Sequence, residues 1–253
     1  MKIKIVKCLK DNYSFIIFNE KNLLCAVVDP SEEEPIIKEV EKNNLILKYI
    51  FNTHHHYDHV GGNKKLKEKY DCKVVGFEED KSRIPEIDIT LKDNQRWKNE
   101  LFECSVLHIP GHTSGHICIY IKELDALFTG DTLFSLGCGR IFEGTYEEMY
   151  KSLSKLKKFP LNTRIYCGHE YTKKNSDFCL SIDSKNSKLI NKIKQINNNI
   201  QNEKPTIPSI LKDELECNIF LRSDNMVIQK QLGINKDDPI KTFAKLRDLK
   251  DNF

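Results

Sequence analysis

One short stretch, residues 51–62 with the sequence FNTHHHYDHVGG, constrains this chain more than any other. It holds four histidines and one aspartate within six positions, namely His54, His55, His56, Asp58 and His59. Packing does not require such a density of imidazole and carboxylate groups, whereas a site for a divalent metal ion does. The preceding segment, LKYIFNT, has the apolar, β-branched and aromatic residues typical of a strand, and a helical run follows. The sequence therefore predicts a metal site where a strand gives way to a helix.

The alternation of side chains along an extended backbone separates the three adjacent histidines. If residues 54–56 are extended, His54 and His56 project to one side and His55 projects to the other. A solvated histidine-rich loop or a tag is the alternative interpretation. The cluster is internal and lies between a predicted strand and a predicted helix, which favours the metal site.

Composition narrows the class of protein. The chain has 253 residues, 39% hydrophobic and 30% charged, which suits a globular core, and its net charge of +3 does not indicate nucleic-acid binding. The N-terminal residues lack the apolar core of a secretion signal, and no apolar run approaches the roughly 18 residues of a membrane span. The nine cysteines form no CxxC pair and are interpreted as reduced thiols. We therefore expect a cytoplasmic protein with neither a nucleic-acid nor a membrane partner.

The pattern of predicted elements changes near residue 172. Before it, short strands alternate with helical segments, as where LLCAVVDP precedes EEEPIIKEVEKN. After it no convincing strand is predicted, and prolines separate helical runs near residues 173–183, 186–202, 210–222 and 239–250. The sequence predicts an α+β protein with a body of residues 1–172 and a small all-helical domain of residues 173–253.

Three further ligand candidates each follow a predicted strand and a glycine. His112 lies in PGHTSGH, Asp131 in FTGDT and His169 in YCGHEYT. This shared order places them on loops at one edge of a sheet, where a site can be assembled from distant parts of the chain. Any one of them alone would be interpreted as a structural histidine or a turn aspartate. Their recurrence alongside the first cluster favours a shared site.

The number of candidate ligands indicates two ions. Three nitrogen ligands for one ion are His54, His56 and His112. A second set comprises Asp58, His59 and His169. Asp131 has two carboxylate oxygens and can bridge the ions. Seven ligands are too many for one tetrahedral zinc, but they suit two ions with a shared carboxylate and a bridging water. Supporting or core roles are left for the other histidines, His55, His108 and His116.

Four blocks resemble those of the metallo-β-lactamase superfamily: THHHYDHVGGN, PGHTSGHICIY, GDTLFSLGCGRIFEGT and YCGHEYT. Nearly the whole chain is similar to the glyoxalase II (hydroxyacylglutathione hydrolase) family within it. The resemblance implies an αββα sandwich with a dinuclear site on one edge. It also implies that the helical region, which ends in LRDLKDNF, is a glutathione-binding domain. β-Lactamases of this fold commonly offer a cysteine to the second ion, whereas this chain offers Asp131.

The resemblance also implies an activity. The family hydrolyses S-(2-hydroxyacyl)glutathione, typically S-D-lactoylglutathione, to glutathione and D-lactate, the second step of methylglyoxal detoxification. In the expected mechanism the nucleophile is a hydroxide that bridges two divalent ions, which lower the pKa of the parent water toward about 7. Asp58 and Asp131 are the expected catalytic carboxylates. Zinc is the first choice of metal, with iron and manganese as alternatives. We expect a monomer or weak dimer that acts on a small glutathione thioester.

Five residues match substrate-binding positions of the family. Arg140 and Phe142 follow the GCG turn, and Phe142 stands where the family often has a tyrosine, so a hydroxyl hydrogen bond is lost. Tyr171 follows the last metal histidine. Arg247 and Lys250 match a basic pair for the glycine carboxylate, since Arg offers bidentate contacts and Lys a point charge. The alternative for Arg247 and Lys250 is a solvated helix face, because KTFAKLRDLKD is rich in charge.

Other activities share these motifs. A persulfide dioxygenase of this fold would hold a single iron with fewer ligands and form sulfite with oxygen. A metallo-nuclease or another hydrolase of the fold is a further alternative, which the near-neutral charge does not favour. A non-catalytic metal-binding module is disfavoured by the complete set of seven ligands.

Overall fold

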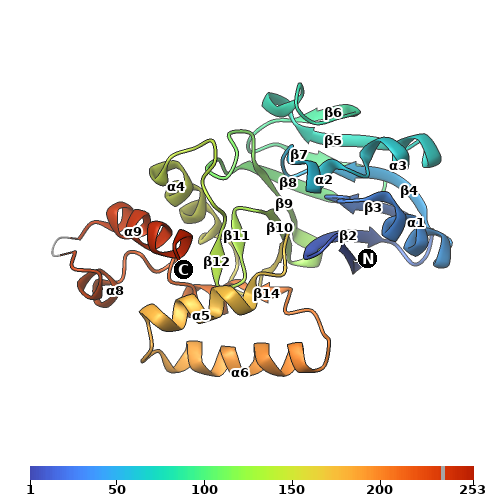
Figure 1. Ribbon diagram of the computed structural model, residues 1–253. Helices are drawn as coiled ribbons and strands as arrows, with labels where there is room; N and C mark the ends of the chain where they lie inside the picture. Colours follow the sequence, from blue (N-terminus) through green and yellow to red (C-terminus); the bar gives the residue numbers. More distant parts are fainter. Residues whose placement is uncertain (235–236) are drawn as a thin grey trace. The chain divides into compact units, whose positions relative to one another are not determined.

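The computed structural model describes residues 1–234 and 237–253 and contains two six-stranded sheets (Figure 1). The first has the order β1-β2-β3-β4-β5-β6, with strands Lys2–Cys8, Asn12–Phe18, Leu24–Val28, Ile46–Phe51, Lys73–Phe77 and Ile87–Leu91. The second has the order β14-β13-β10-β9-β8-β7, and β7 to β10, β13 and β14 span Arg96–Lys98, Glu103–His108, Ile117–Ile121, Ala126–Gly130, Arg164–Cys167 and Ser209–Ile210. A separate hairpin pairs β11 (Leu133–Phe134) with β12 (Gly137–Cys138).

The parallel half of the first sheet carries the helices. Strands β1 to β3 are antiparallel, whereas β3 to β6 are parallel, and parallel neighbours need crossover connections. Helix α1 (Glu33–Lys42) joins β3 to β4, and helices α2 (Tyr57–Val60) and α3 (Asn63–Tyr70) join β4 to β5. Val28 pairs with Phe51, so the carboxyl ends of β3 and β4 meet at one edge. The histidine-rich stretch starts at that edge.

Alternation along the strands of the first sheet gives it two apolar faces. On one face, Ile16 and Val27 belong to a buried cluster with Ile36 of α1 and Leu66 of α3. A strand buried on both sides has a continuous apolar sequence, which explains the run LCAVV in β3. The helices therefore cover this face of the sheet.

Aromatic residues fill the opposite face, where strands of the second sheet pack. The rings of Phe15 in β2 and Phe128 in β10 have centroids 5.4 Å apart. The ring centroid of Phe51, at the end of β4, lies 5.6 Å from that of Trp97 in β7 and 5.7 Å from that of Phe102. Two sheets thus share a core of aromatic side chains, with helices outside the first sheet. The predicted α+β class is confirmed.

The C-terminal part of the chain is mainly helical, as predicted. After two short 3-10 turns, Glu78–Asp80 and Lys122–Leu124, the helices α4 to α9 span Tyr146–Leu156, Thr172–Ile182, Ser187–Gln201, Leu211–Cys217, Met226–Gln231 and Pro239–Asp251. Helix α4 begins at a capping box. The Thr145 side chain accepts from the Glu148 amide, and the Glu148 side chain accepts from the Thr145 amide. The helices pack as neighbouring pairs, α5 with α6, α6 with α7, and α9 with both α4 and α8.

Three details of the helical region differ from the sequence prediction. Residues Ser209–Ile210 form a short strand where only helices were expected, because Pro208 holds the preceding chain out of a helix. The helix predicted over 210–222 ends at Cys217, since Asn218 is extended and its side chain accepts from the Phe220 amide. Helix α8 was not predicted and starts where Asn225 caps the Val227 amide.

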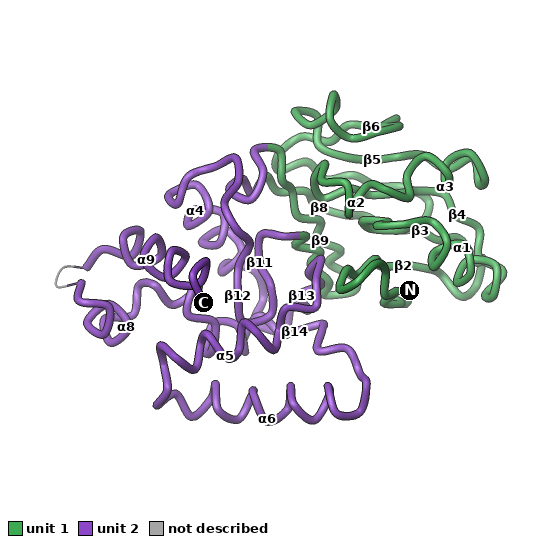
Figure 2. The backbone as a smooth tube through the Cα atoms, in the orientation of Figure 1, with its two compact units in different colours: residues 1–108, 115–130 green, residues 109–114, 131–253 purple. Residues whose placement is uncertain are grey.

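By internal contacts the chain divides into two compact units, Met1–His108 with Gly115–Gly130, and Ile109–Ser114 with Asp131–Phe253 (Figure 2). This division differs from the domain boundary predicted near residue 172, which stays a prediction. None of the helices in the described part of the chain combines the length and apolarity that crossing a bilayer requires.

Candidate metal centre

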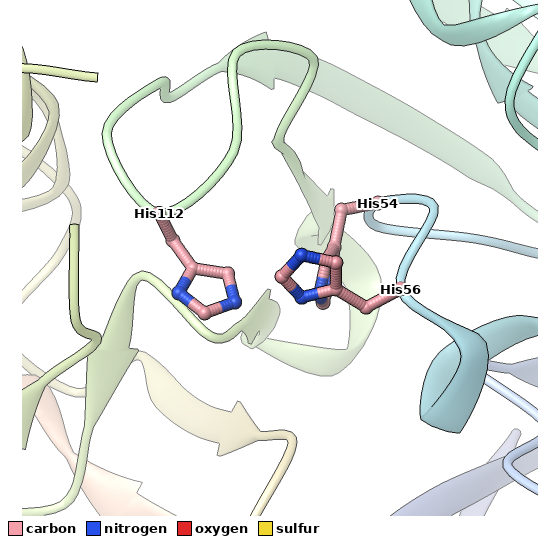
Figure 3. A group of neighbouring side chains, drawn as sticks. All are labelled: His54, His56 and His112. Atoms are coloured by element: carbon pink, nitrogen blue, oxygen red, sulfur yellow. The ribbon is translucent and has the colours of Figure 1, made fainter. Parts of the chain in front are cut away.

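The histidine-rich loop separates its histidines as predicted. The rings of His54 and His56 have centroids 4.8 Å apart, and Figure 3 shows both side chains reaching the same place. His55 instead has its Nδ1 atom 3.3 Å from a carboxylate oxygen of the buried Asp80. The loop is a bend rather than a continued strand, so the separation comes from the turn into α2 as well as from alternation.

Asp29 at the end of β3 holds the loop in place. Its Oδ1 accepts from the Thr53 amide at 2.7 Å, and its Oδ2 accepts from the Thr53 hydroxyl at 2.6 Å and lies 3.0 Å from His59 Nδ1. Asp29 belongs to one group of potential ligands with His54 and His59. Because both its oxygens already accept hydrogen bonds, we interpret Asp29 as the group that orients His59 and presents its Nε2 atom.

Asn12 holds Asp58 in place through hydrogen bonds. The Nδ2 atom of Asn12 donates to Asp58 Oδ2 at 2.9 Å and to the Asp58 carbonyl at 3.0 Å. Asp58 Oδ2 then lies 3.8 Å from His59 Nε2. Asn12 was not among the predicted site residues, and nothing in its local sequence indicates a contact with a residue 46 positions away.

Asp131 lies between two of the later histidines. Its Oδ2 atom is 3.6 Å from His112 Nε2 and 3.2 Å from His169 Nε2. The Nδ1 atom of His112 is 2.8 Å from the Arg140 carbonyl, which leaves Nε2 facing the carboxylate. The ring of His169 stacks on that of Tyr171 at 4.7 Å, with 3° between their planes.

The predicted ligands form two groups in the structure. One contains His54, His56 and His112 (Figure 3), and the other contains Asp58, His59 and His169. Within each group the candidate ligand atoms all lie within 4.8 Å of one another. The sequence analysis assigned these two sets of three to two ions, an assignment that stays a prediction.

The chemistry of these donors fits divalent metal ions. His54, His59 and His112 each have Nδ1 beside a protein oxygen, contributed by the Thr53 hydroxyl, the Asp29 carboxylate and the Arg140 carbonyl. A ligating histidine typically donates its other ring nitrogen in this way, which fixes the tautomer and the ring orientation. Imidazole nitrogens with carboxylate oxygens suit zinc, iron and manganese.

The remaining three histidines contact a proposed ligand or pack against neighbouring side chains. His116 is fully buried and stacks on His54, with ring centroids 4.6 Å apart. His108 stacks on Phe77 at 4.7 Å. With the contact between His55 and Asp80, these placements agree with the supporting and core roles expected for them.

Two substrate candidates are exposed around His112. The ring of Phe142 is 62% exposed and lies 5.2 Å from the His112 ring. The Arg140 guanidinium is also exposed, and its Nε atom is 3.3 Å from a carboxylate oxygen of Asp251.

The other two basic candidates are more buried than the sequence suggested. Arg247 is only 4% exposed, and it donates from Nη1 to the Cys138 carbonyl at 2.7 Å and from Nη2 to Asp251 at 2.9 Å. The alternative of a solvated helix face is therefore wrong for this residue. Lys250 donates to the Lys174 carbonyl at 3.0 Å, and burial lowers its pKa below the usual value.

Comparisons with known proteins agree with this fold and this chemistry. The model of the metallo-beta-lactamase superfamily matches residues 11–92 and 99–169, and the model of the hydroxyacylglutathione hydrolase C-terminus matches residues 170–253. The chain is 55% identical to a hydroxyacylglutathione hydrolase of Pelagibacter ubique (strain HTCC1062), over the full length of both.

Solved structures with the same fold are more distant. ETHE1 from Myxococcus xanthus is 20% identical with a TM-score of 0.66, covering 99% of this chain and 98% of that one. TTHA1623 in a di-iron-bound form is 26% identical with a TM-score of 0.56, covering 65% of this chain and 90% of that one.

Fold and donor set together define a divalent-metal-binding protein of the metallo-β-lactamase type. Within that superfamily, the chain belongs to the hydroxyacylglutathione hydrolase family. The resemblance noted in the sequence is confirmed over the full length.

Proposed function

We propose that this enzyme hydrolyses the thioester of S-(2-hydroxyacyl)glutathione, typically S-D-lactoylglutathione, to glutathione and the 2-hydroxy acid. That reaction is the second step of methylglyoxal detoxification. The relative from Pelagibacter ubique bears the name of this activity. The observation that carries the proposal is the place of Asp131, whose Oδ2 atom approaches one histidine of each ligand group. A shared carboxylate of this kind is what a dinuclear hydrolytic centre needs.

We assign two divalent ions to these groups. His54, His56 and His112 would hold one, and Asp58, His59 and His169 the other, with Asp131 shared. Zinc is the first choice for such donors, and iron or manganese is an alternative. A relative that is 26% identical has been solved in a di-iron-bound form, which supports the count of two.

The residues of the chain then have separate tasks. When bound, two such ions supply an acidified water and polarise the substrate carbonyl. Asp58, held by Asn12, is placed to orient that water or to receive its proton at Oδ2. The leaving group is a thiolate, and a thiol with a reference pKa of about 8.5 departs without a strong general acid. Catalysis therefore depends on holding the carboxylates in place.

The substrate's carboxylates would be bound by basic residues beside this centre. Arg140 and Arg247 both contact the carboxylate of Asp251, so their guanidinium groups converge on one anionic group. A substrate carboxylate would replace that of Asp251 there, with Lys250 adding positive charge nearby along α9. Phe142 and Tyr171, which touch His112 and His169, would flank the thioester end.

The proposal also covers the domains, the oligomeric state and the cellular location of the enzyme. Residues 1–172 would form the catalytic domain and residues 173–253 the glutathione-binding domain of a monomer or weak dimer. The nine cysteines are reduced thiols in the structure, and burial raises the pKa of Cys167 and Cys179 to about 12, so these two thiols stay protonated. Free thiols support a cytoplasmic enzyme.

Removal of the metal provides the first test. Dialysis against a chelator should abolish hydrolysis of S-D-lactoylglutathione, followed by the loss of thioester absorbance, and two equivalents of zinc per chain should restore it. Oxygen consumption with glutathione persulfide, measured on the same samples, controls for the dioxygenase alternative. Thioester hydrolysis that persists in metal-free protein would contradict the proposal.

The variant Arg140→Met tests the substrate site. We expect KM for S-D-lactoylglutathione to rise about tenfold with little change in kcat, because a charge-assisted carboxylate contact of about 1.5 kcal/mol is common to ground and transition states. The matched control is Arg96→Met, which removes the same charge from an exposed position on strand β7. A fall in kcat with unchanged KM would argue against a carboxylate contact.

A further inference from the structure

Residues 131–140, here called the ligand loop, contact two proposed metal ligands, because the loop contains Asp131 and also touches His112. The loop begins at Asp131, and it ends at Arg140, whose carbonyl lies 2.8 Å from His112 Nδ1. The Gly139 amide donates to the Thr132 carbonyl at 3.2 Å, which closes the loop on itself. The conformation of this loop therefore sets the positions of both Asp131 and His112.

The loop does not have enough regular structure to fix that conformation alone. Its two strands, β11 and β12, have two residues each, and Leu136 at the turn has φ of +57°, which is unfavourable for a residue with a side chain. Ordering such a segment costs conformational entropy. Contacts from elsewhere must stabilise it.

Those contacts come from side chains of the helices that follow in the chain. The Leu136 amide donates to Glu214 Oε2 at 2.8 Å, and Asn218 Nδ2 donates to the Gly137 carbonyl at 3.0 Å. Backbone carbonyls at 135, 136 and 138 accept from the side chains of Asn175, Cys179 and Arg247. Helices α5, α7 and α9 thus bind successive backbone groups of the ligand loop.

Glu214 and Asn218 form the centre of this arrangement. They lie four residues apart, Glu214 within α7 and Asn218 directly after its last residue. Both side chains are fully buried, and Asn218 Nδ2 also donates to Glu214 Oε2 at 3.0 Å. Burial raises the pKa of Glu214, while the bonds from Leu136 and Asn218 oppose that shift. A buried carboxyl is costly unless its partners are held in place, so the loop and this pair fix each other.

We propose that Glu214 and Asn218 are positioning residues of the metal centre, which act through the ligand loop on Asp131 and His112. The helical region then has a second task besides the substrate binding proposed above, because it sets how tightly the catalytic ions are held. This inference rests on the proposed assignment of Asp131 and His112 as ligands.

The test compares zinc affinity with stability. The full chain is loaded with zinc, and zinc is withdrawn by a chromophoric chelator while the melting temperature of the metal-free form is measured separately. We expect Asn218→Ala to hold zinc about tenfold more weakly, since outer contacts of ligands typically affect affinity by about 10–100-fold. Glu214→Gln keeps an acceptor for the Leu136 amide and should stay near the wild-type affinity. Asn218→Ser replaces Asn218→Ala if the latter does not fold.

The control is Asp183→Asn, which removes a part-buried carboxylate that binds Arg222 and Asn186 in the same helical region, away from the ligand loop. It should lower the melting temperature without changing zinc affinity. The proposal is overturned if Asn218→Ala and Asn218→Ser keep wild-type affinity, or if Asp183→Asn loses zinc to the same extent. A wild-type chain that binds no zinc would instead overturn the proposed metal centre itself.

Discussion

Asp131→Asn should lower kcat for thioester hydrolysis by about a hundredfold or more and reduce the zinc content from two equivalents toward one. The Oδ2 atom of Asp131 is 3.6 Å from His112 Nε2 and 3.2 Å from His169 Nε2, so one carboxylate would serve both proposed ligand groups. An amide of the same size lacks the negative charge and offers only one oxygen. The expected loss exceeds the roughly 10–100-fold typical of contacts outside the ligand set.

Activity and metal content must be measured on the same Asp131→Asn sample. Asp224→Asn is the control, because this exposed carboxylate forms an ion pair with Lys157 at the surface of the helical region, and it should leave both quantities unchanged. Near-normal kcat with a single bound zinc would show that one ion is enough and would contradict the dinuclear assignment. Two bound zincs with lost activity would place Asp131 in the chemistry rather than in metal retention.

Sequence patterns predict this fold well where the signal is local. The apolar run of β3 and the helical spacing of Met149, Leu153 and Leu156 in α4 are each set by burial of one face or both, and burial leaves a periodic pattern. The strand Ser209–Ile210 and the six-residue helix α8 were missed because elements this short carry no period. Their places depend on packing with residues distant in the chain.

The proposed ligands could be selected from the sequence, whereas the residues that orient them could not. His112, Asp131 and His169 each follow a strand and a glycine, and that order is visible in the chain. Asp29 and Asn12 orient His59 and Asp58 from 30 and 46 positions away. Contacts of such separation depend on how strands meet in the sheet, which no local pattern records. Of these two supporting residues, the local sequence pointed only to Asp29, which stands next to Pro30 at the end of an apolar strand.

Gly139→Ala should weaken zinc binding and slow catalysis, although Gly139 contributes no ligand atom. A Cβ atom at this position would lie 1.8 Å from the Asp131 carbonyl oxygen and 3.2 Å from His112 Nδ1. The first distance is far below any van der Waals contact and involves backbone, so the ligand loop must move rather than one flexible side chain. Overpacking of this kind typically costs about 1–3 kcal/mol of stability. Because the displaced atoms belong to two proposed ligands, we expect zinc affinity to fall at least about tenfold and kcat with it.

Gly233→Ala separates this local effect from a general cost of replacing glycine. Gly233 has φ of +71°, and a Cβ atom added there would meet nothing within 4 Å, so alanine strains the backbone without a clash. That strain should cost about 1 kcal/mol and lower the melting temperature, yet zinc content and kcat should stay at wild-type values. If Gly139→Ala also keeps its zinc and its kcat, the ligand loop tolerates a shift of its backbone, and the positions of Asp131 and His112 do not depend on its close packing.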